Sequence, residues 1–191
     1  KHKAGYVNII GNPNVGKSTL MNALIGQKLS IISHKAQTTR HRILGILNEK
    51  DYQIVFSDTP GVINPEYKLQ ESMMNFVYSA FQDADVLIYM IEIGEKGLKD
   101  KKLFERLKNT NIPLLMLLNK IDLADQDFVS KEMVRWKEQL PNAKLLPISA
   151  LNNFNIDVIK NKILELLPVC PPYFDKEAIT DKSERFFIEE I

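Results

Sequence analysis

Residues 6–19 read Tyr-Val-Asn-Ile-Ile-Gly-Asn-Pro-Asn-Val-Gly-Lys-Ser-Thr, and this stretch decides the fold of the chain. It contains the spacing G-x-x-x-x-G-K-[ST] of a P-loop, after an apolar run that favours a strand and before residues 19–25, which favour a helix. Glycines at positions 11 and 16 let the backbone turn successive N–H groups toward one anion, and the positive end of the helix dipole adds to that site. The pattern predicts a binding site for the phosphates of a nucleoside triphosphate.

The polar residues of this loop have separate predicted roles. Lys17 supplies a positive charge against the β- and γ-phosphates, and the Ser18 hydroxyl is a ligand for Mg²⁺. A simple glycine turn between a strand and a helix would require neither residue. We therefore expect nucleotide contacts from Gly11, Asn12, Pro13, Asn14, Val15, Gly16, Lys17, Ser18 and Thr19.

A second motif, Asp-Thr-Pro-Gly at 58–61, follows the strand-like run 52–57 and comes about forty residues after the P-loop. At the end of a strand beside the P-loop, the Asp58 carboxylate can hold Mg²⁺ through a water molecule, and the Gly61 N–H can meet the γ-phosphate. The motif therefore predicts a second set of phosphate and metal contacts, from Asp58, Thr59, Pro60, Gly61 and Val62.

The position after this glycine bears on hydrolysis. Ras-like enzymes that use a glutamine to orient the attacking water carry it there, and this chain has Val62. Gln53 and Gln70 are poor substitutes, because one is on a predicted strand and the other is well beyond the motif. Charge neutralisation by Mg²⁺, Lys17 and the P-loop amides must then carry the chemistry, and we expect slow intrinsic turnover.

Two later motifs predict that the base is guanine. Asn-Lys-Ile-Asp at 119–122 ends the apolar run 113–118, and the Asp122 carboxylate can accept hydrogen bonds from the guanine N1–H and 2-amine. Adenine offers neither donor, so ATP would leave polar groups unpaired. Ser-Ala-Leu at 149–151 follows the run 144–148, where a backbone N–H can reach the guanine O6. We expect base contacts from Asn119, Lys120, Asp122, Ser149, Ala150 and Leu151.

Strand-like and helix-like segments alternate along the chain, which is typical of a mostly parallel α/β sheet with helices on both faces. Lys50 and Asp51 alone separate the second and third strands, so these two form a hairpin and the six-stranded sheet has one antiparallel strand. Open α/β sheets bind ligands at the carboxyl ends of their strands, where all of these motifs are placed. We expect strands near 5–10, 43–49, 52–58, 85–92, 112–119 and 144–149, and helices near 17–27, 69–82, 97–109, 127–139 and 153–166.

Composition indicates one core and a tail. A chain of 191 residues with 45% hydrophobic residues suits one α/β domain, and a net charge of +1 gives no field that would steer it to DNA or to a membrane. The single Cys170 excludes a disulfide framework and suits the cytoplasm. Prolines at 168, 171 and 172 end the last helix, so we expect a domain at 1–172 and a linker at 173–191. A start at Lys1, without methionine, predicts a piece of a longer protein.

The order of the four motifs resembles the translation-factor-type bacterial GTPases that share the Ras-like G domain. Residues 35–43 are similar to the first switch of the Era family of ribosome-assembly GTPases, and Phe174 with residues 179–187 resembles the linker before the RNA-binding KH domain of that family. The resemblance implies hydrolysis of GTP to GDP and a nucleotide switch, at about 29–42 and 59–70, in assembly of the small ribosomal subunit with 16S rRNA. A G domain of the EngA or MnmE type remains the alternative.

The resemblance also implies roles for individual residues. Thr39 would bind Mg²⁺ and sense the γ-phosphate, so that Lys17, Thr39 and Gly61 form the catalytic set. Asn14 either shapes the turn after Pro13 or, as in potassium-activated relatives, binds K⁺ beside the phosphates. The basic residues at 28, 35, 40 and 42 form either a solvated face or a contact for ribosomal RNA. The family further implies a cytoplasmic protein that visits the inner membrane surface.

Overall fold

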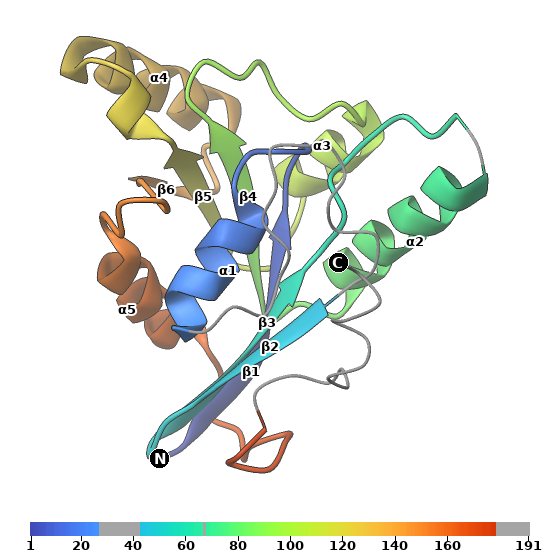
Figure 1. The fold of residues 1–191 in the computed structure, drawn as a ribbon, viewed down its shortest axis with the longest axis vertical. Coiled ribbons are helices and arrows are strands. Elements are labelled where there is room, and N and C mark those ends of the chain that lie inside the picture. The colour runs from blue at the N-terminus through green and yellow to red at the C-terminus, as the bar shows by residue number, and fades with distance from the viewer. Residues whose placement is uncertain (27–42, 67, 179–191) are drawn as a thin grey trace.

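A six-stranded sheet is the centre of the structure, a computed structural model that describes residues 1–26, 43–66 and 68–178. The strands lie in the order β2-β3-β1-β4-β5-β6, and every neighbouring pair is parallel except β2 and β3 (Figure 1). This confirms the predicted fold class and its antiparallel hairpin. The strands are β1 (Lys3–Ile10), β2 (Ile43–Asn48), β3 (Tyr52–Asp58), β4 (Val86–Glu92), β5 (Leu114–Asn119) and β6 (Lys144–Pro147).

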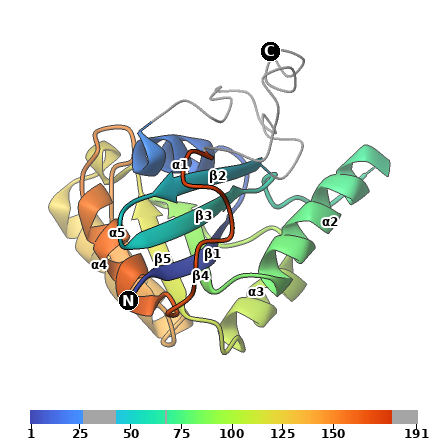
Figure 2. The ribbon, with the colours of Figure 1, turned by 90° about the horizontal axis from the view of Figure 1, so that it is seen from below.

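Helices cover both faces of the sheet (Figure 2). One face packs against α1 (Lys17–Ile25) and α5 (Ile156–Leu166), and the other packs against α2 (Lys68–Gln82), α3 (Lys101–Lys108) and α4 (Gln126–Gln139). A short 3₁₀ helix, Ile121–Leu123, follows β5. None of the helices within the described residues is long and apolar enough to span a membrane.

Strand β4 shows why the central strands appear in the sequence as continuous apolar runs. Its residues 86–91 are all fully buried. Val86, Ile88 and Met90 belong to the core under α1 and α5. Their neighbours Leu87, Tyr89 and Ile91 belong to the core under α2, α3 and α4. Because β4 is covered on both faces, its first charged residue is Glu92, at its end, and there the polar site residues begin.

Two predicted helix starts are wrong, and the backbone explains both. The helix expected from 97 begins at Lys101, because Gly97 has a φ of 146° and Asp100 caps the helix by accepting hydrogen bonds from the N–H groups of residues 102 and 103. The helix expected from 153 begins at Ile156, because Asn153 and Asn155 have φ values of 56° and 62°. Such left-handed residues cannot continue a right-handed helix.

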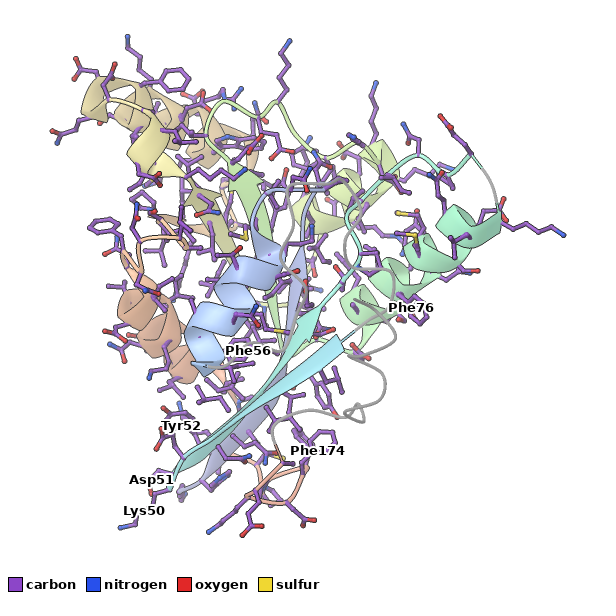
Figure 3. All side chains as sticks on the ribbon, in the orientation of Figure 1. Lys50, Asp51, Tyr52, Phe56, Phe76 and Phe174 are labelled. Carbon is purple, nitrogen blue, oxygen red and sulfur yellow. The ribbon has the colours of Figure 1, made fainter. Side chains whose placement is uncertain are left out.

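The chain after α5 lies against the sheet. Val169 pairs with Lys3, and the ring of Tyr173 lies 5.2 Å from that of Tyr6. The carboxamide of Gln53 accepts hydrogen bonds from the N–H groups of Tyr173 and Phe174, at 2.8 and 3.1 Å, and donates to the Phe174 carbonyl at 2.9 Å. This segment therefore passes from β1 to the β2–β3 hairpin, beside which Phe174 lies (Figure 3).

The position of Gln53 generates a prediction about stability. Gln53 is only 1% exposed, so Gln53→Ala should lower the free energy of unfolding by about 1–3 kcal/mol, because the partly buried backbone groups at 173–174 lose their partner. Chemical denaturation measures the change. The same substitution in a chain shortened to residues 1–172 is the control, and it should cost clearly less. An equal cost in both chains would show that the segment does not depend on Gln53.

Candidate nucleotide-binding site

The P-loop between β1 and α1 has the backbone that its glycines predict. Gly16 has a φ of 104°, and a Cβ there would lie 2.4 Å from Nδ2 of Asn119. A Cβ on Gly11 would lie 2.3 Å from the carbonyl oxygen of Met90. Asn14 is also left-handed, with a φ of 63°, and its side chain is exposed. The loop is thus packed tightly against the ends of β4 and β5, and larger residues at 11 or 16 would displace it.

Lys17 is a buried cation, with 6% of its surface exposed. Its Nζ donates hydrogen bonds to the carbonyl oxygens of Gly11, at 3.1 Å, and Asn12, at 2.8 Å. Burial lowers the pKa of Lys17 to about 8, while the carboxylates of Asp58 and Glu95 act in the opposite direction. A charge that its surroundings solvate poorly is stabilised by a nearby anion, and a phosphate group provides one.

Ser18 and Asp58 place two oxygen atoms side by side at the start of α1. The Ser18 Oγ donates to Oδ2 of Asp58 at 2.6 Å, and Asp58 is fully buried at the end of β3. Parallel pairing of β3 with β1 sets Asp58 opposite Ile9, directly before the P-loop. A hydroxyl and a carboxylate are hard oxygen ligands, and Mg²⁺ in such sites takes its other ligands from phosphates and water. These two residues fit that ion.

The residues after Asp58 pack on the P-loop. Thr59 Oγ1 donates to the carbonyl oxygen of Ile9 at 2.7 Å, and a Cβ on Gly61 would lie 2.7 Å from Pro13. The Val62 N–H donates to the carbonyl oxygen of Gly11 at 2.9 Å, while its side chain is fully buried in the core under α2. Pro60, between Thr59 and Gly61 in the chain, is buried as well. The backbone at 61–62 therefore lies at the phosphate site, but the Val62 side chain does not.

The two glutamines considered above, Gln53 and Gln70, both make hydrogen bonds within the protein. The Gln53 carboxamide is engaged with residues 173–174, and Oε1 of Gln70 accepts a hydrogen bond from the Glu66 N–H at 2.7 Å. These contacts agree with the expectation that Gln53 and Gln70 are poor substitutes for a glutamine that orients water.

Asn119 joins three of the motifs through its carboxamide. Its Nδ2 donates to the carbonyl oxygen of Val15 in the P-loop at 2.8 Å, and its Oδ1 accepts from the Ala150 N–H at 2.9 Å. Ser149 donates from Oγ to Oδ1 of Asp122 at 2.6 Å, which orients a carboxylate that is otherwise exposed. Leu151 is 77% exposed beside it. The residues predicted to contact the base thus meet at one edge of the sheet.

Lys120 links the base site to the phosphate site. It has a φ of 63°, and its Nζ donates to the carbonyl oxygen of Asn14 at 2.7 Å and forms an ion pair with Glu92. Glu92 ends β4, directly opposite Asn119. Sequence reasoning missed Glu92 and also Glu95, which contacts Asn12. Their position at the end of a central strand, on the same edge as the other motifs, was the available signal.

Several predicted residues lie outside the described part of the chain. Thr39, the rest of the first switch at 29–42 and the basic residues at 28, 35, 40 and 42 belong to this group. The linker residues 179–187 that resemble the family do so as well. Their roles stay predictions.

Four motifs lie at the carboxyl edge of a mostly parallel sheet: the P-loop, D-T-P-G, N-K-I-D and S-A-L. This combination defines a Ras-like P-loop G domain. The family model described as "50S ribosome-binding GTPase" matches residues 6–120. The chain therefore belongs to this GTPase family.

Within it, the similarity to GTPase Era extends over the whole chain. Era of Alkaliphilus metalliredigens is 41% identical over 191 residues, and Era of Clostridium botulinum strain Hall is 42% identical over 190. This chain spans 65% and 64% of those two proteins.

Solved structures agree with this similarity. Era in complex with MgGDPNP and nucleotides 1506–1542 of 16S ribosomal RNA superposes with a TM-score of 0.93 at 38% identity, over all of this chain and 65% of that one. A variant of Aquifex aeolicus Era bound to GDP and AlF₄⁻ gives 0.90, also at 38% identity, over 98% of this chain and 65% of that one. The predicted resemblance to the Era family is confirmed.

The geometry at Asp122 predicts base specificity. Asp122→Asn should weaken GTP binding by about 2–4 kcal/mol, because it replaces a charge-assisted acceptor. Xanthosine triphosphate, which carries a carbonyl in place of the 2-amine, should bind this variant better than GTP does. Titration calorimetry with both nucleotides measures the exchange. Asp127→Asn, an exposed change in the first turn of α4, is the control. Unaltered GTP affinity in Asp122→Asn would contradict the assignment.

The burial of Lys17 predicts that its function and its contribution to stability are separate. Lys17→Met should keep the free energy of unfolding of the nucleotide-free protein within about 1 kcal/mol, since it removes a poorly solvated charge and keeps similar volume. The same change should lower GTP affinity at least about a hundredfold, because the charge on the phosphates is lost. Thermal unfolding and nucleotide titration give the two quantities. A variant that fails to fold would show that the lysine is structural.

Proposed function

We propose that this chain binds GTP together with Mg²⁺ and hydrolyses it to GDP and phosphate. The observation that carries the proposal is the shared edge of the sheet: Lys17 and the Ser18–Asp58 pair lie at one side of Asn119, and Asp122 with its Ser149 partner lies at the other. Era relatives solved with MgGDPNP and with GDP and AlF₄⁻ support the same ligands.

Each part of the site has a distinct task in this proposal. Asp122 accepts from the guanine ring and rejects adenine. Lys17 and the N–H groups of the P-loop neutralise the phosphates. Ser18 binds Mg²⁺ directly, and Asp58 holds it through water. Because Val62 is directed into the core, no side chain at position 62 can orient the attacking water. The site then contributes stabilisation of charge, so turnover is slow.

The γ-phosphate also controls the conformation of the two switch segments, residues 29–42 and 59–70. Gly61 is the residue whose N–H meets it, and its contact with Pro13 ties this N–H to the P-loop. Thr39 is the proposed second protein ligand of Mg²⁺, and it brings residues 29–42 to the same phosphate. Hydrolysis then releases residues 29–42 and 59–70 together, which is the order–disorder change used by Ras-like proteins.

The switch is proposed to act in small ribosomal subunit assembly, with 16S rRNA as partner. The support is the Era structure that holds a 16S rRNA fragment. Because the chain spans 65% of that protein, we assign residues 1–172 to the G domain and expect RNA to be read by a KH domain that follows the linker at 173–191. Such a partner places the activity in the cytoplasm. Association with the inner membrane surface stays a prediction of the family resemblance alone.

A monovalent cation is the proposed activator in place of a glutamine. Asn14 is exposed and left-handed within the P-loop, so its side chain is available beside the phosphates. Its carbonyl group is held by Lys120, which fixes the backbone at this position. An amide oxygen there can bind K⁺ and stabilise the charge that develops on the leaving phosphate.

Hydrolysis in two salts tests this function. Phosphate release from GTP with Mg²⁺ should be slow but measurable, and several-fold faster in KCl than in NaCl at equal ionic strength. Asn14→Ala should abolish the difference. Asn153→Ala, which removes another left-handed asparagine, is the control and should preserve it. Absence of hydrolysis would refute the proposed enzyme, whereas equal rates in both salts would refute only the cation.

A further inference from the structure

The side chain of Asn12 faces away from the interior of the P-loop. It is 6% exposed, and both of its polar atoms are bonded to the loop that joins β4 to α3. Its Nδ2 donates to a carboxylate oxygen of Glu95 and, at 2.7 Å, to the carbonyl oxygen of Gly97. Its Oδ1 accepts from the Lys99 N–H at 3.0 Å. A buried carboxamide with all of these bonds made defines one position of the two loops relative to each other.

Glu95 is the charged member of this contact. Its second carboxylate oxygen accepts from the Glu92 N–H at 3.1 Å, and its carbonyl oxygen accepts from the Arg135 guanidinium at 2.6 Å. Burial raises the pKa of Glu95, while its hydrogen bonds with Glu92 and Asn12 and the charge of Lys17 act in the opposite direction. Both carboxylate oxygens are therefore used as acceptors, which an amide at position 95 could not reproduce.

The contact reaches the phosphate site through the backbone of Asn12. Lys17 donates to the Asn12 carbonyl oxygen at 2.8 Å, so the peptide that holds Lys17 belongs to the same residue whose side chain is fixed by Glu95. The Glu95 charge also acts directly on Lys17. On the other side, Asp100 caps α3 at the end of the same loop.

We propose that Asn12 and Glu95 form a latch between the P-loop and the β4–α3 loop, and that this latch positions Lys17 for the phosphates. Both are positioning residues, because they act through Lys17 and the P-loop backbone. The inference rests on the proposed function, and it assigns to Asn12 a role that its place in the P-loop motif does not: the backbone faces the nucleotide, and the side chain faces Glu95.

A double-mutant cycle tests the pair: wild type, Asn12→Asp, Glu95→Gln and the two changes combined, with affinity for a fluorescent, non-hydrolysable GTP analogue as the measured quantity. Asn12→Ala should weaken binding about tenfold, since the Glu95 carboxylate, the Gly97 carbonyl oxygen and the Lys99 N–H all lose their partly buried hydrogen bonds to this side chain. Asn12→Asp should weaken it further, because two carboxylates then face each other. Combining Asn12→Asp with Glu95→Gln restores a donor opposite an acceptor, and should recover several-fold of the loss. Lys96→Ala, an exposed change on the same loop, should leave the affinity unchanged.

A second measurement separates the positioning of Lys17 from a general loss of structure in the nucleotide site. The ratio of the affinities for GTP and ITP depends on Asp122 and should stay at the wild-type value in Asn12→Ala. Unchanged affinity in Asn12→Ala, or a double variant that binds no better than Asn12→Asp alone, would overturn the latch, and a collapsed GTP/ITP ratio would show a merely structural role. If the wild-type chain itself did not bind GTP, the proposed function would fail. The same cycle in thermal unfolding would then decide whether the two side chains are coupled.

Discussion

The hydrogen bonds of the Asn119 carboxamide are the constraint on which the rest of the site depends. One donor reaches the Val15 carbonyl group in the P-loop, and one acceptor takes the Ala150 N–H in the loop after β6. Strand β5 lies between β4 and β6, so a single side chain at its end can reach loops on both sides. The absence of a side chain at Gly16 gives this carboxamide its space. The loops that carry the predicted phosphate and base contacts are thereby held at a fixed separation.

Much of this arrangement could be predicted from the sequence, because it depends on local patterns. Runs such as 86–91 and 114–118 are apolar on both faces and mark central strands, and two residues between β2 and β3 leave only a hairpin. Spacing of the motifs then places Lys17, Asp58 and Asp122 on one edge. Helix starts at 101 and 156 were missed, since they depend on one cap and on left-handed asparagines whose backbone angles the sequence does not display.

Long-range contacts of polar side chains could not be predicted. Gln53 reads as one polar residue on a strand, and its function is to bind residues more than a hundred positions later. Asn12 occupies a position that the P-loop motif leaves unspecified, yet its partners lie in the loop after β4. Glu95 belongs to none of the four sequence motifs. In each case the pairing follows from the order of strands in the sheet, which brings together loops that are far apart in the chain.

These polar contacts also show how the fold divides stability from function. Strands β1, β3 and β4 bury apolar side chains on both faces along most of their length. Buried polar residues of the site gather at the carboxyl edge of the sheet, after β1, β3, β5 and β6: Asn12, Lys17, Asp58, Thr59, Asn119 and Ser149. Burial of such groups is unfavourable unless each finds a partner. For Asp58, Asn119 and Ser149 the partners lie in other motifs, and for Asn12 they lie in the loop between β4 and α3. Lys17 differs from these residues because its hydrogen-bond partners lie in its own P-loop and because burial lowers its pKa. The edge of the sheet therefore holds a buried cation that its surroundings solvate poorly, and an anionic ligand is the natural partner for it.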